Sequence, residues 1–195
     1  MEEIFQKAQA LEKQAWKVVE ETNLLDIWQS VGATINAVGS LKMGLLMNHR
    51  DIDFHIYTDP FILSESFSAI ARLAENPRIR TINYANLLDA EDKCIEWHAF
   101  YEVREGELWQ IDMIHILSDS PYAGHFEKVA ERISQVLTPK TRQAVLCIKD
   151  AMPKDKKVMG IEIYQAVIRD GVRDITSFWQ WKEKNSSGGI ITWMP

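Results

Sequence analysis

The stretch "VGSLKMGLLMNHRDIDFHIYTD", from Val38 to Asp59, decides the fold of this chain. Residues 33–38, "ATINAV", favour a short strand that leads into a Gly-Ser turn, and residues 41–47 favour a brief helix after it. Residues 51–58, "DIDFHIYT", alternate polar and apolar side chains and predict a second strand. A strand, a glycine turn, a helix and a returning strand thus form one unit.

The Asp-Ile-Asp triplet places two carboxylates on one side of the second strand. Residues two apart in a strand point the same way, so Asp51, Asp53 and His55 share a face, while the apolar residues between them face the core. Neighbouring carboxylates repel each other unless a cation lies between them. Hard oxygen ligands at this spacing suit Mg²⁺ or Mn²⁺.

The Gly39-Ser40 pair stands where the first strand gives way to the helix. Backbone N–H groups at a helix start attract anions, and glycine lets a phosphate approach closely. The stretch therefore joins a phosphate cradle to a metal clamp. Nucleotidyl transfer needs both, because cations neutralise the triphosphate while aligning the attacking and leaving oxygens.

With this pattern the stretch resembles the nucleotidyltransferase superfamily typified by DNA polymerase β. The family motif is an apolar residue, Gly, and Gly or Ser, then a spacer and carboxylate-apolar-carboxylate-apolar. The chain has Val38-Gly39-Ser40, a ten-residue spacer, and Asp51-Ile52-Asp53-Phe54. The resemblance covers roughly residues 31–117 and implies a third carboxylate on a neighbouring strand, a place that Asp112 in "LWQIDMIHI" fits.

The resemblance implies transfer of a nucleoside monophosphate, AMP from ATP or another nucleoside triphosphate, to a hydroxyl group. It assigns nucleotide contacts to four residues: Gly39, Ser40, Lys42 and Arg50. It assigns Mg²⁺ or Mn²⁺ binding and catalysis to three carboxylates: Asp51, Asp53 and Asp112. Asp112 is also the expected general base. The chain departs from the family in having His49-Arg50 where many relatives have Ser-Asp, and Lys42 where arginine is frequent.

The rest of the pattern predicts an α+β protein with two lobes. A small mixed-sheet nucleotidyltransferase lobe is expected over residues 1–120, with a helix starting at Asp59-Pro60 and a hairpin of strands at 94–103 and 107–117. From Pro121 on, apolar residues recur only at helical spacing, which predicts an all-helical lobe over residues 121–195. In this organisation the chain is similar to the small bacterial lincosamide and aminoglycoside nucleotidyltransferases.

The composition of the chain indicates which partners and which cellular location to expect. The chain has 195 residues, 46% hydrophobic and 26% charged, with a net charge of −6, which argues against a nucleic-acid partner. The first 21 residues lack a secretory pattern and no apolar run could span a bilayer, so a cytoplasmic protein without membrane contact is expected.

Cys94 and Cys147 have no metal-ligand spacing and are expected to be buried thiols. Trp179 and Trp181, expected on the surface, permit a homodimer.

The acceptor stays open at this point. A small hydroxyl-bearing molecule such as an antibiotic, hence antibiotic resistance, is the main hypothesis. The alternatives are a non-catalytic nucleotide-binding or regulatory protein, suggested by His49-Arg50, and an enzyme that acts on a protein or RNA acceptor.

Several other side chains have two interpretations. An aromatic trio is expected to pack within the hairpin rather than to line an acceptor pocket: Trp97, Tyr101 and Trp109. Three histidines are expected to have no direct role. His55 is expected to be a polar surface or hydrogen-bonded residue, with a place behind the metal-binding carboxylates as the alternative, and His98 and His115 are expected to be structural. Three cations of the helical lobe either reach a triphosphate or cover a solvated face: Lys140, Arg142 and Lys149.

Overall fold

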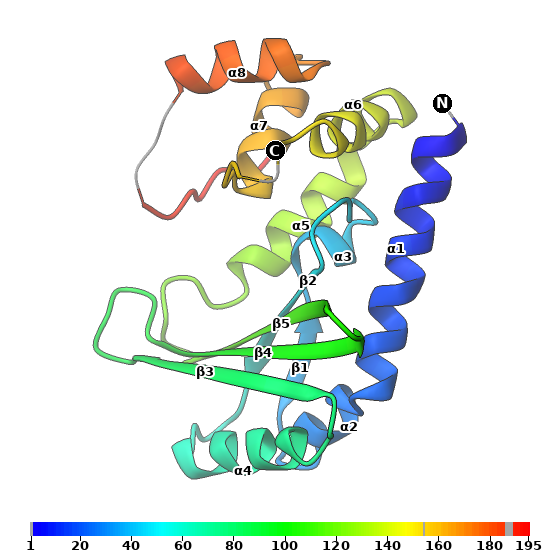
Figure 1. Cartoon of the computed structure of the whole chain (residues 1–195). Helices are drawn as coiled ribbons and strands as arrows, with labels where there is room; N and C mark the ends of the chain where they lie inside the picture. The colour runs from blue at the N-terminus through cyan, green and yellow to red at the C-terminus, as the bar shows by residue number, and fades with distance from the viewer. Residues whose placement is uncertain (1, 154, 186–188) are drawn as a thin grey trace.

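A computed structural model describes residues 2–153, 155–185 and 189–195, and over these residues it shows one five-stranded sheet and eight helices (Figure 1). The strands are β1 (Thr34–Ala37), β2 (Asp51–Tyr57), β3 (Ile79–Leu87), β4 (Cys94–Arg104) and β5 (Glu107–Ile116). The helices are α1 (Glu2–Glu21), α2 (Leu24–Gln29), α3 (Gly39–Lys42), α4 (Leu63–Ala74), α5 (His125–Val136), α6 (Pro139–Asp150), α7 (Gly160–Ile168) and α8 (Ile175–Lys184). None of the described helices is long and apolar enough to cross a membrane.

The sheet is mixed, which confirms the predicted α+β class. Its strand order is β1-β2-β5-β4-β3, and only β2 and β5 run parallel to each other. β4 and β5 form the predicted hairpin. In the parallel pair Asp53 stands beside Asp112, so the pairing register brings together two carboxylates that are 59 positions apart in the sequence.

The two faces of the sheet have different characters because side chains alternate along each strand. One face is packed against α2 and α4, which lie below the sheet in Figure 1. Its buried side chains include Ile52, Phe54, Trp97, Tyr101 and Trp109, so the three aromatic residues lie in the core as expected. The opposite face has polar side chains and lies toward α3, α5 and the later helices.

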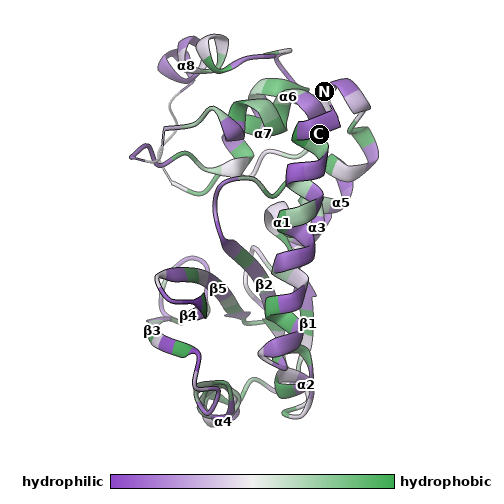
Figure 2. Ribbon diagram, turned by 45° about the vertical axis from the view of Figure 1, so that its right-hand side comes forward, coloured by the Kyte–Doolittle hydropathy of each residue, from purple (hydrophilic) through white to green (hydrophobic). Residues whose placement is uncertain are grey.

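A second hydrophobic cluster lies above the sheet and is built mainly by α5 to α8. α7 runs through this cluster, and its ribbon is largely green in Figure 2. α1 contributes to both clusters, with Ala8 in the helical one and Ala15, Val18 and Val19 in the sheet cluster. The division of the chain at residue 120 stays a prediction, because side chains from residues 4–47 also pack among the C-terminal helices.

Three local expectations were wrong, each for a packing or backbone reason. The helix expected from Asp59-Pro60 begins at Leu63, since the preceding segment places Phe61 against the ring of His115, 4.7 Å between centroids. The helix expected over residues 41–47 is only α3, because Gly44 takes a φ of +64° that ends it. Trp181 is 8% exposed and packs in the helical cluster.

His115 occupies a core position of β5 and makes stability depend on pH. It is fully buried, and burial lowers its pKa from 6.5 to about 4. As the pH falls below 6.5 the unfolded chain takes up this proton before the folded protein does, so folding weakens by about 3 kcal/mol by pH 4. We expect His115→Gln to reduce the loss of stability between pH 7 and pH 4.5 by about 2 kcal/mol, measured by urea unfolding. Equal losses in both proteins would show that His115 is not the group responsible.

Candidate active site

The Gly-Ser turn holds its glycine directly against a carboxylate. Gly39 has a φ of +62°, and a Cβ built on it would lie 2.3 Å from Oδ2 of Asp53. The Val38 amide donates to the Asp53 carbonyl at 2.9 Å, which fixes the turn beside β2. The glycine is therefore required twice, for its backbone conformation and for the space that the carboxylate takes. α3 has only four residues, so its backbone alone makes a weak anion site.

The three predicted carboxylates meet on the polar face of the sheet. Asp51 and Asp53 come from β2 and Asp112 from β5, and all three line one cavity. Among the described residues, none donates a hydrogen bond to the carboxylates of Asp51 and Asp53. Burial raises the pKa of Asp53 to about 7, with further rises from the charges of Asp51 and Asp112, while Lys149 opposes the change. Partly buried carboxylate oxygens without donors fit a divalent cation, whose charge would remove the repulsion.

Asp112 differs from the other two carboxylates because it has donors. His98 on β4 stands opposite Asp112, and its Nδ1 lies 2.5 Å from Oδ1 of Asp112. Gln110 donates to the same oxygen at 2.8 Å. Burial by itself would lower the pKa of His98, but the hydrogen bonds and charges of Asp112 and Glu96 outweigh burial and raise it. His98 therefore lines the cavity and contacts Asp112, whereas the sequence had suggested only a structural place for it.

A buried cation from the helical lobe reaches the Gly-Ser turn. Lys149 on α6 is 8% exposed, and its ammonium donates to Ser40 Oγ at 2.7 Å, to the Tyr164 hydroxyl at 3.0 Å and to the Leu45 carbonyl at 3.0 Å. All three acceptors are neutral, and no described carboxylate forms an ion pair with this lysine. A buried charge with only neutral partners attracts an anion. Of the three cations considered from the sequence, Lys149 is the one that the structure brings to the site.

The carboxylates and the helical lobe enclose a cavity of about 440 Å³. Gly39, Ser40 and Tyr164 line it together with the three carboxylates, and an apolar wall faces them from α5: Phe126, Val129, Ala130 and Ile133. A smaller hollow of about 60 Å³ lies between Ser40, His49, Asp51 and Lys149. All three carboxylates thus border the large, mostly apolar space, and Asp51 also borders the small hollow of mixed polar and apolar lining.

His55 also lines the cavity, where it is buried rather than on the surface. It is 7% exposed, and its Nδ1 lies 3.3 Å from a carboxylate oxygen of Glu127 on α5. Strand alternation predicted the face that this histidine shares with the two aspartates. Its burial depends on α5, which the sequence of β2 does not reveal.

Comparisons with known proteins give information on the fold. No family model and no curated protein matches the chain. The structure of the Cid1 poly(U) polymerase aligns with 85% of this chain and 53% of its own at 14% identity, with a TM-score of 0.53. A cytoplasmic RNA terminal U-transferase aligns with 76% of this chain and 46% of its own, at 13% identity and a TM-score of 0.49. The non-canonical poly(A) polymerase complex GLD-2–GLD-3 aligns with 76% of this chain and 57% of its own, at 11% identity and a TM-score of 0.40.

The chain has a nucleotidyltransferase fold. It spans about half the length of the solved structures that it matches. The nucleotidyltransferase fold explains why the Gly-Ser turn and the aspartates of β2 and β5 are adjacent, since β2 follows the turn and pairs with β5.

Two basic residues of the predicted nucleotide site lie apart from the cavity of this nucleotidyltransferase fold. Lys42 is exposed at the end of α3 and is not among the cavity-lining residues. The guanidinium of Arg50 forms an ion pair with Glu107 at 3.2 Å. Arg50 therefore does not neutralise Asp51, although the two are adjacent in sequence.

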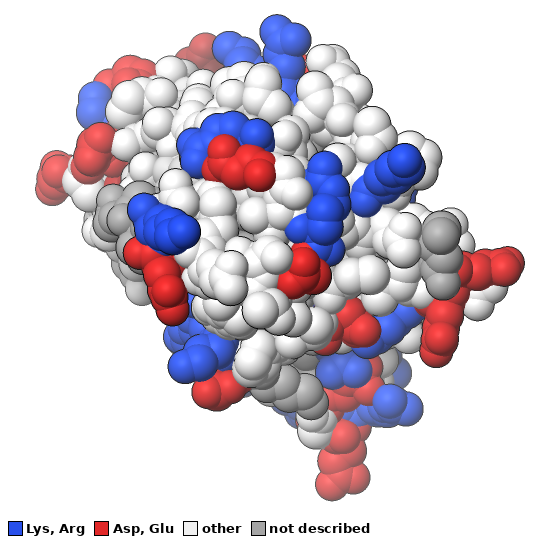
Figure 3. Space-filling model, turned by 90° about the horizontal axis from the view of Figure 1, so that it is seen from above, with Lys and Arg blue, Asp and Glu red and all other residues white. Residues whose placement is uncertain are grey.

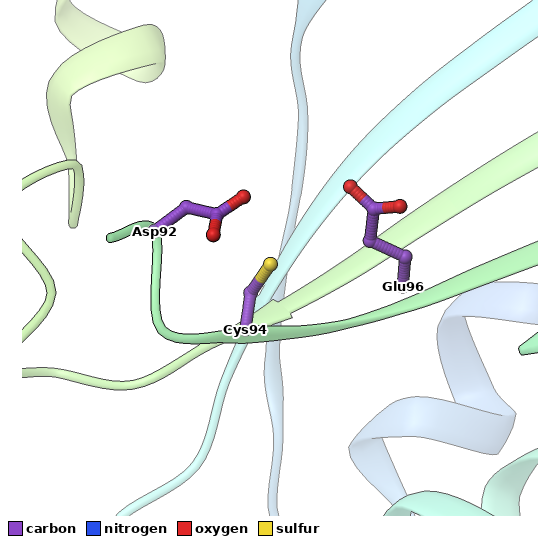
Figure 4. A group of neighbouring side chains, drawn as sticks. All are labelled: Asp92, Cys94 and Glu96. Atoms are coloured by element: carbon purple, nitrogen blue, oxygen red, sulfur yellow. The ribbon is translucent and has the colours of Figure 1, made fainter. Parts of the chain in front are cut away.

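A second group of potential ligands lies on the same sheet face at the start of β4. Asp92, Cys94 and Glu96 each have a ligand atom within 4.8 Å of the others, and Figure 4 shows their side chains pointing toward one another. Burial raises the pKa of Cys94 to about 12, and the charges of Asp92 and Glu96 add to the rise. Cys94 is therefore a buried neutral thiol, as predicted. Strand alternation could have revealed its pairing with Glu96, which we had not expected.

Proposed function

We propose that this protein transfers the nucleoside monophosphate of a nucleoside triphosphate to a hydroxyl group. The observation that carries the proposal is the meeting of Asp51, Asp53 and Asp112 beside the Gly39-Ser40 turn, where all three line one cavity. The nucleotidyltransferase fold supports the same activity.

The site residues divide into two groups by their chemistry. Ser40 and Lys149 border the small hollow and would bind the triphosphate through a hydroxyl and an ammonium group. Asp51, Asp53 and Asp112 would hold Mg²⁺ or Mn²⁺, which when bound stabilises charge on the attacking and leaving oxygens.

Asp112 is suited to accept the proton of the attacking hydroxyl. That hydroxyl oxygen forms a bond to the α-phosphorus, the bond from the α-phosphorus to the bridging oxygen breaks, and pyrophosphate leaves. The β2–β5 pairing would keep the base beside the reacting phosphorus, because Asp112 stands next to Asp53.

For the acceptor we propose the end of an RNA chain. The support is the fold likeness to the Cid1 poly(U) polymerase. A small hydroxyl-bearing molecule such as an antibiotic is the second candidate, favoured by the net charge of −6. Figure 3 shows acidic and basic side chains interspersed on the face seen from above, so the described residues form no broad basic surface on that face.

The proposed activity is tested with the wild-type protein and four α-labelled nucleoside triphosphates in Mg²⁺. Each is offered with a short RNA oligonucleotide, with a lincosamide and with an aminoglycoside, and label transfer is measured together with pyrophosphate release. Calorimetry with a non-hydrolysable ATP analogue gives the binding reference. Nucleotide binding that ignores Mg²⁺, with no transfer to any acceptor, would favour the non-catalytic alternative and reject the proposed activity.

Lys149 gives a prediction for nucleotide affinity. Lys149→Met removes the cation that donates to Ser40 while keeping a side chain of similar length, so the dissociation constant of the ATP analogue should rise about 10- to 100-fold. Lys140→Met, an exposed lysine at the start of the same helix, is the matched control and should bind as wild type does. Equal affinity in Lys149→Met, with an unchanged melting temperature, would exclude Lys149 from the phosphate site.

A further inference from the structure

The carboxylate of Asp112 is tied to the sheet through one of its two oxygens. His98 Nδ1 lies 2.5 Å from Oδ1, and Gln110 Nε2 donates to that same atom at 2.8 Å. Within the described parts of the chain, no group donates to Oδ2. Because Asp112 lines the cavity, Oδ2, which accepts no hydrogen bond from the described residues, is the oxygen available to a ligand there.

Both donors come from strands that pair with each other. His98 stands directly opposite Asp112 in the antiparallel β4–β5 pair, and Gln110 precedes Asp112 by two residues, on the same face of β5. The far nitrogen of the ring, Nε2, lies 3.4 Å from Oε2 of Glu96. The ring is thus held at both nitrogens, and its position follows from the strand register rather than from a loop.

We propose that His98 and Gln110 are positioning residues, which hold Asp112 by Oδ1 so that Oδ2 is presented to the cavity. This deepens the proposed function and rests on it. A carboxylate without such partners rotates about its side-chain bonds, and an acidic side chain that must both hold a cation and accept a proton needs one orientation. The two holding residues need not touch the substrate.

The proposal separates binding from turnover. Within the described parts of the chain, no hydrogen bond or ion pair joins His98 to Asp51, Asp53, Ser40 or Lys149. Nucleotide affinity measured without Mg²⁺ should therefore not depend on this histidine. His98→Ala should lower kcat about 10- to 100-fold and leave the dissociation constant of the ATP analogue, measured without Mg²⁺, within twofold of wild type. His98→Asn keeps an N–H near the place of Nδ1 and should recover kcat to within about threefold of wild type, whereas His98→Ala cannot. A residue that only supported the fold would lower affinity and melting temperature as well.

Crystal structures of the two variants give a readout that does not depend on activity. We expect the Asp112 carboxylate to turn away from its wild-type position in His98→Ala and to keep it in His98→Asn. An unmoved carboxylate in His98→Ala, or a wild-type kcat in that variant, overturns the positioning role. If Asp112 moves as expected but the wild-type protein transfers no nucleotide, the proposed activity fails and the positioning role stands.

Discussion

Asp53→Asn should abolish nucleotide transfer and, in the absence of metal, stabilise the protein. Asparagine keeps the shape of the side chain and removes the charge that a divalent cation needs. We expect a loss of about 10³-fold or more in kcat, because Asp53 lies between Asp51 and Asp112 and against the Gly-Ser turn.

The expected gain in stability follows from the raised pKa of Asp53. The carboxyl has a pKa of about 7 in the folded protein and 3.8 as the reference value. The folded protein therefore binds this proton more tightly than the unfolded chain does, and stability is lost as the pH rises from about 4 to 7. An asparagine has no such loss, so Asp53→Asn should be more stable by about 2–4 kcal/mol at pH 8 without metal.

Thermal and urea unfolding at pH 8, with EDTA and with Mg²⁺, measure both effects. Mg²⁺ should stabilise the wild-type protein and leave Asp53→Asn unaffected. Asp59→Asn changes an exposed carboxylate just past the end of β2 and should alter neither activity nor the response to Mg²⁺. If Asp53→Asn is less stable than wild type in EDTA, the carboxylate cluster is not under the repulsion that we describe.

Gly39→Ala should reduce transfer about 100-fold without removing any functional group. The added methyl carbon would lie 2.3 Å from Oδ2 of Asp53, so the carboxylate or the turn must move. A displacement of about 1 Å at a reacting centre is enough for an effect of this size. The left-handed φ of +62° adds a conformational penalty of about 1 kcal/mol.

Gly106→Ala separates these two contributions. Gly106, in the turn between β4 and β5, has a φ of +74° and nothing within 4 Å of the place of a Cβ. It should show the same loss of about 1 kcal/mol in urea unfolding while retaining wild-type activity. If Gly39→Ala keeps full activity, the close approach of the turn to Asp53 has no role in the reaction.

The sequence was sufficient for the parts of the site that follow from local periodicity. Asp51 and Asp53 share a face because strands alternate, and Gly39 marks a backbone conformation that other residues resist. Asp112 was chosen because the family resemblance implies a third carboxylate on a neighbouring strand, and the apolar residues around Asp112 fit such a strand. The same reasoning gave the β4–β5 hairpin, since its two apolar runs flank Glu105-Gly106.

The remaining site residues depend on contacts between distant segments. Lys149 stood among other helical cations until the packing of α6 placed it 2.7 Å from Ser40. Tyr164 belongs to an apolar stripe of α7, where nothing in the sequence separates a core tyrosine from one that faces a cavity. His98 became part of the site only through the pairing register of β4 with β5, which sequence periodicity does not give.

α1 has a consequence for how the cavity opens. The helix is about 30 Å long and packs its first half among the C-terminal helices and its second half on the sheet cluster. A hinge motion of one cluster against the other would pull Ala8 or Ala15 out of its packing. The helix thus joins the two clusters from which the cavity walls come, so that separating the clusters requires breaking the packing of α1. No residue of α1 is among those that line the cavity.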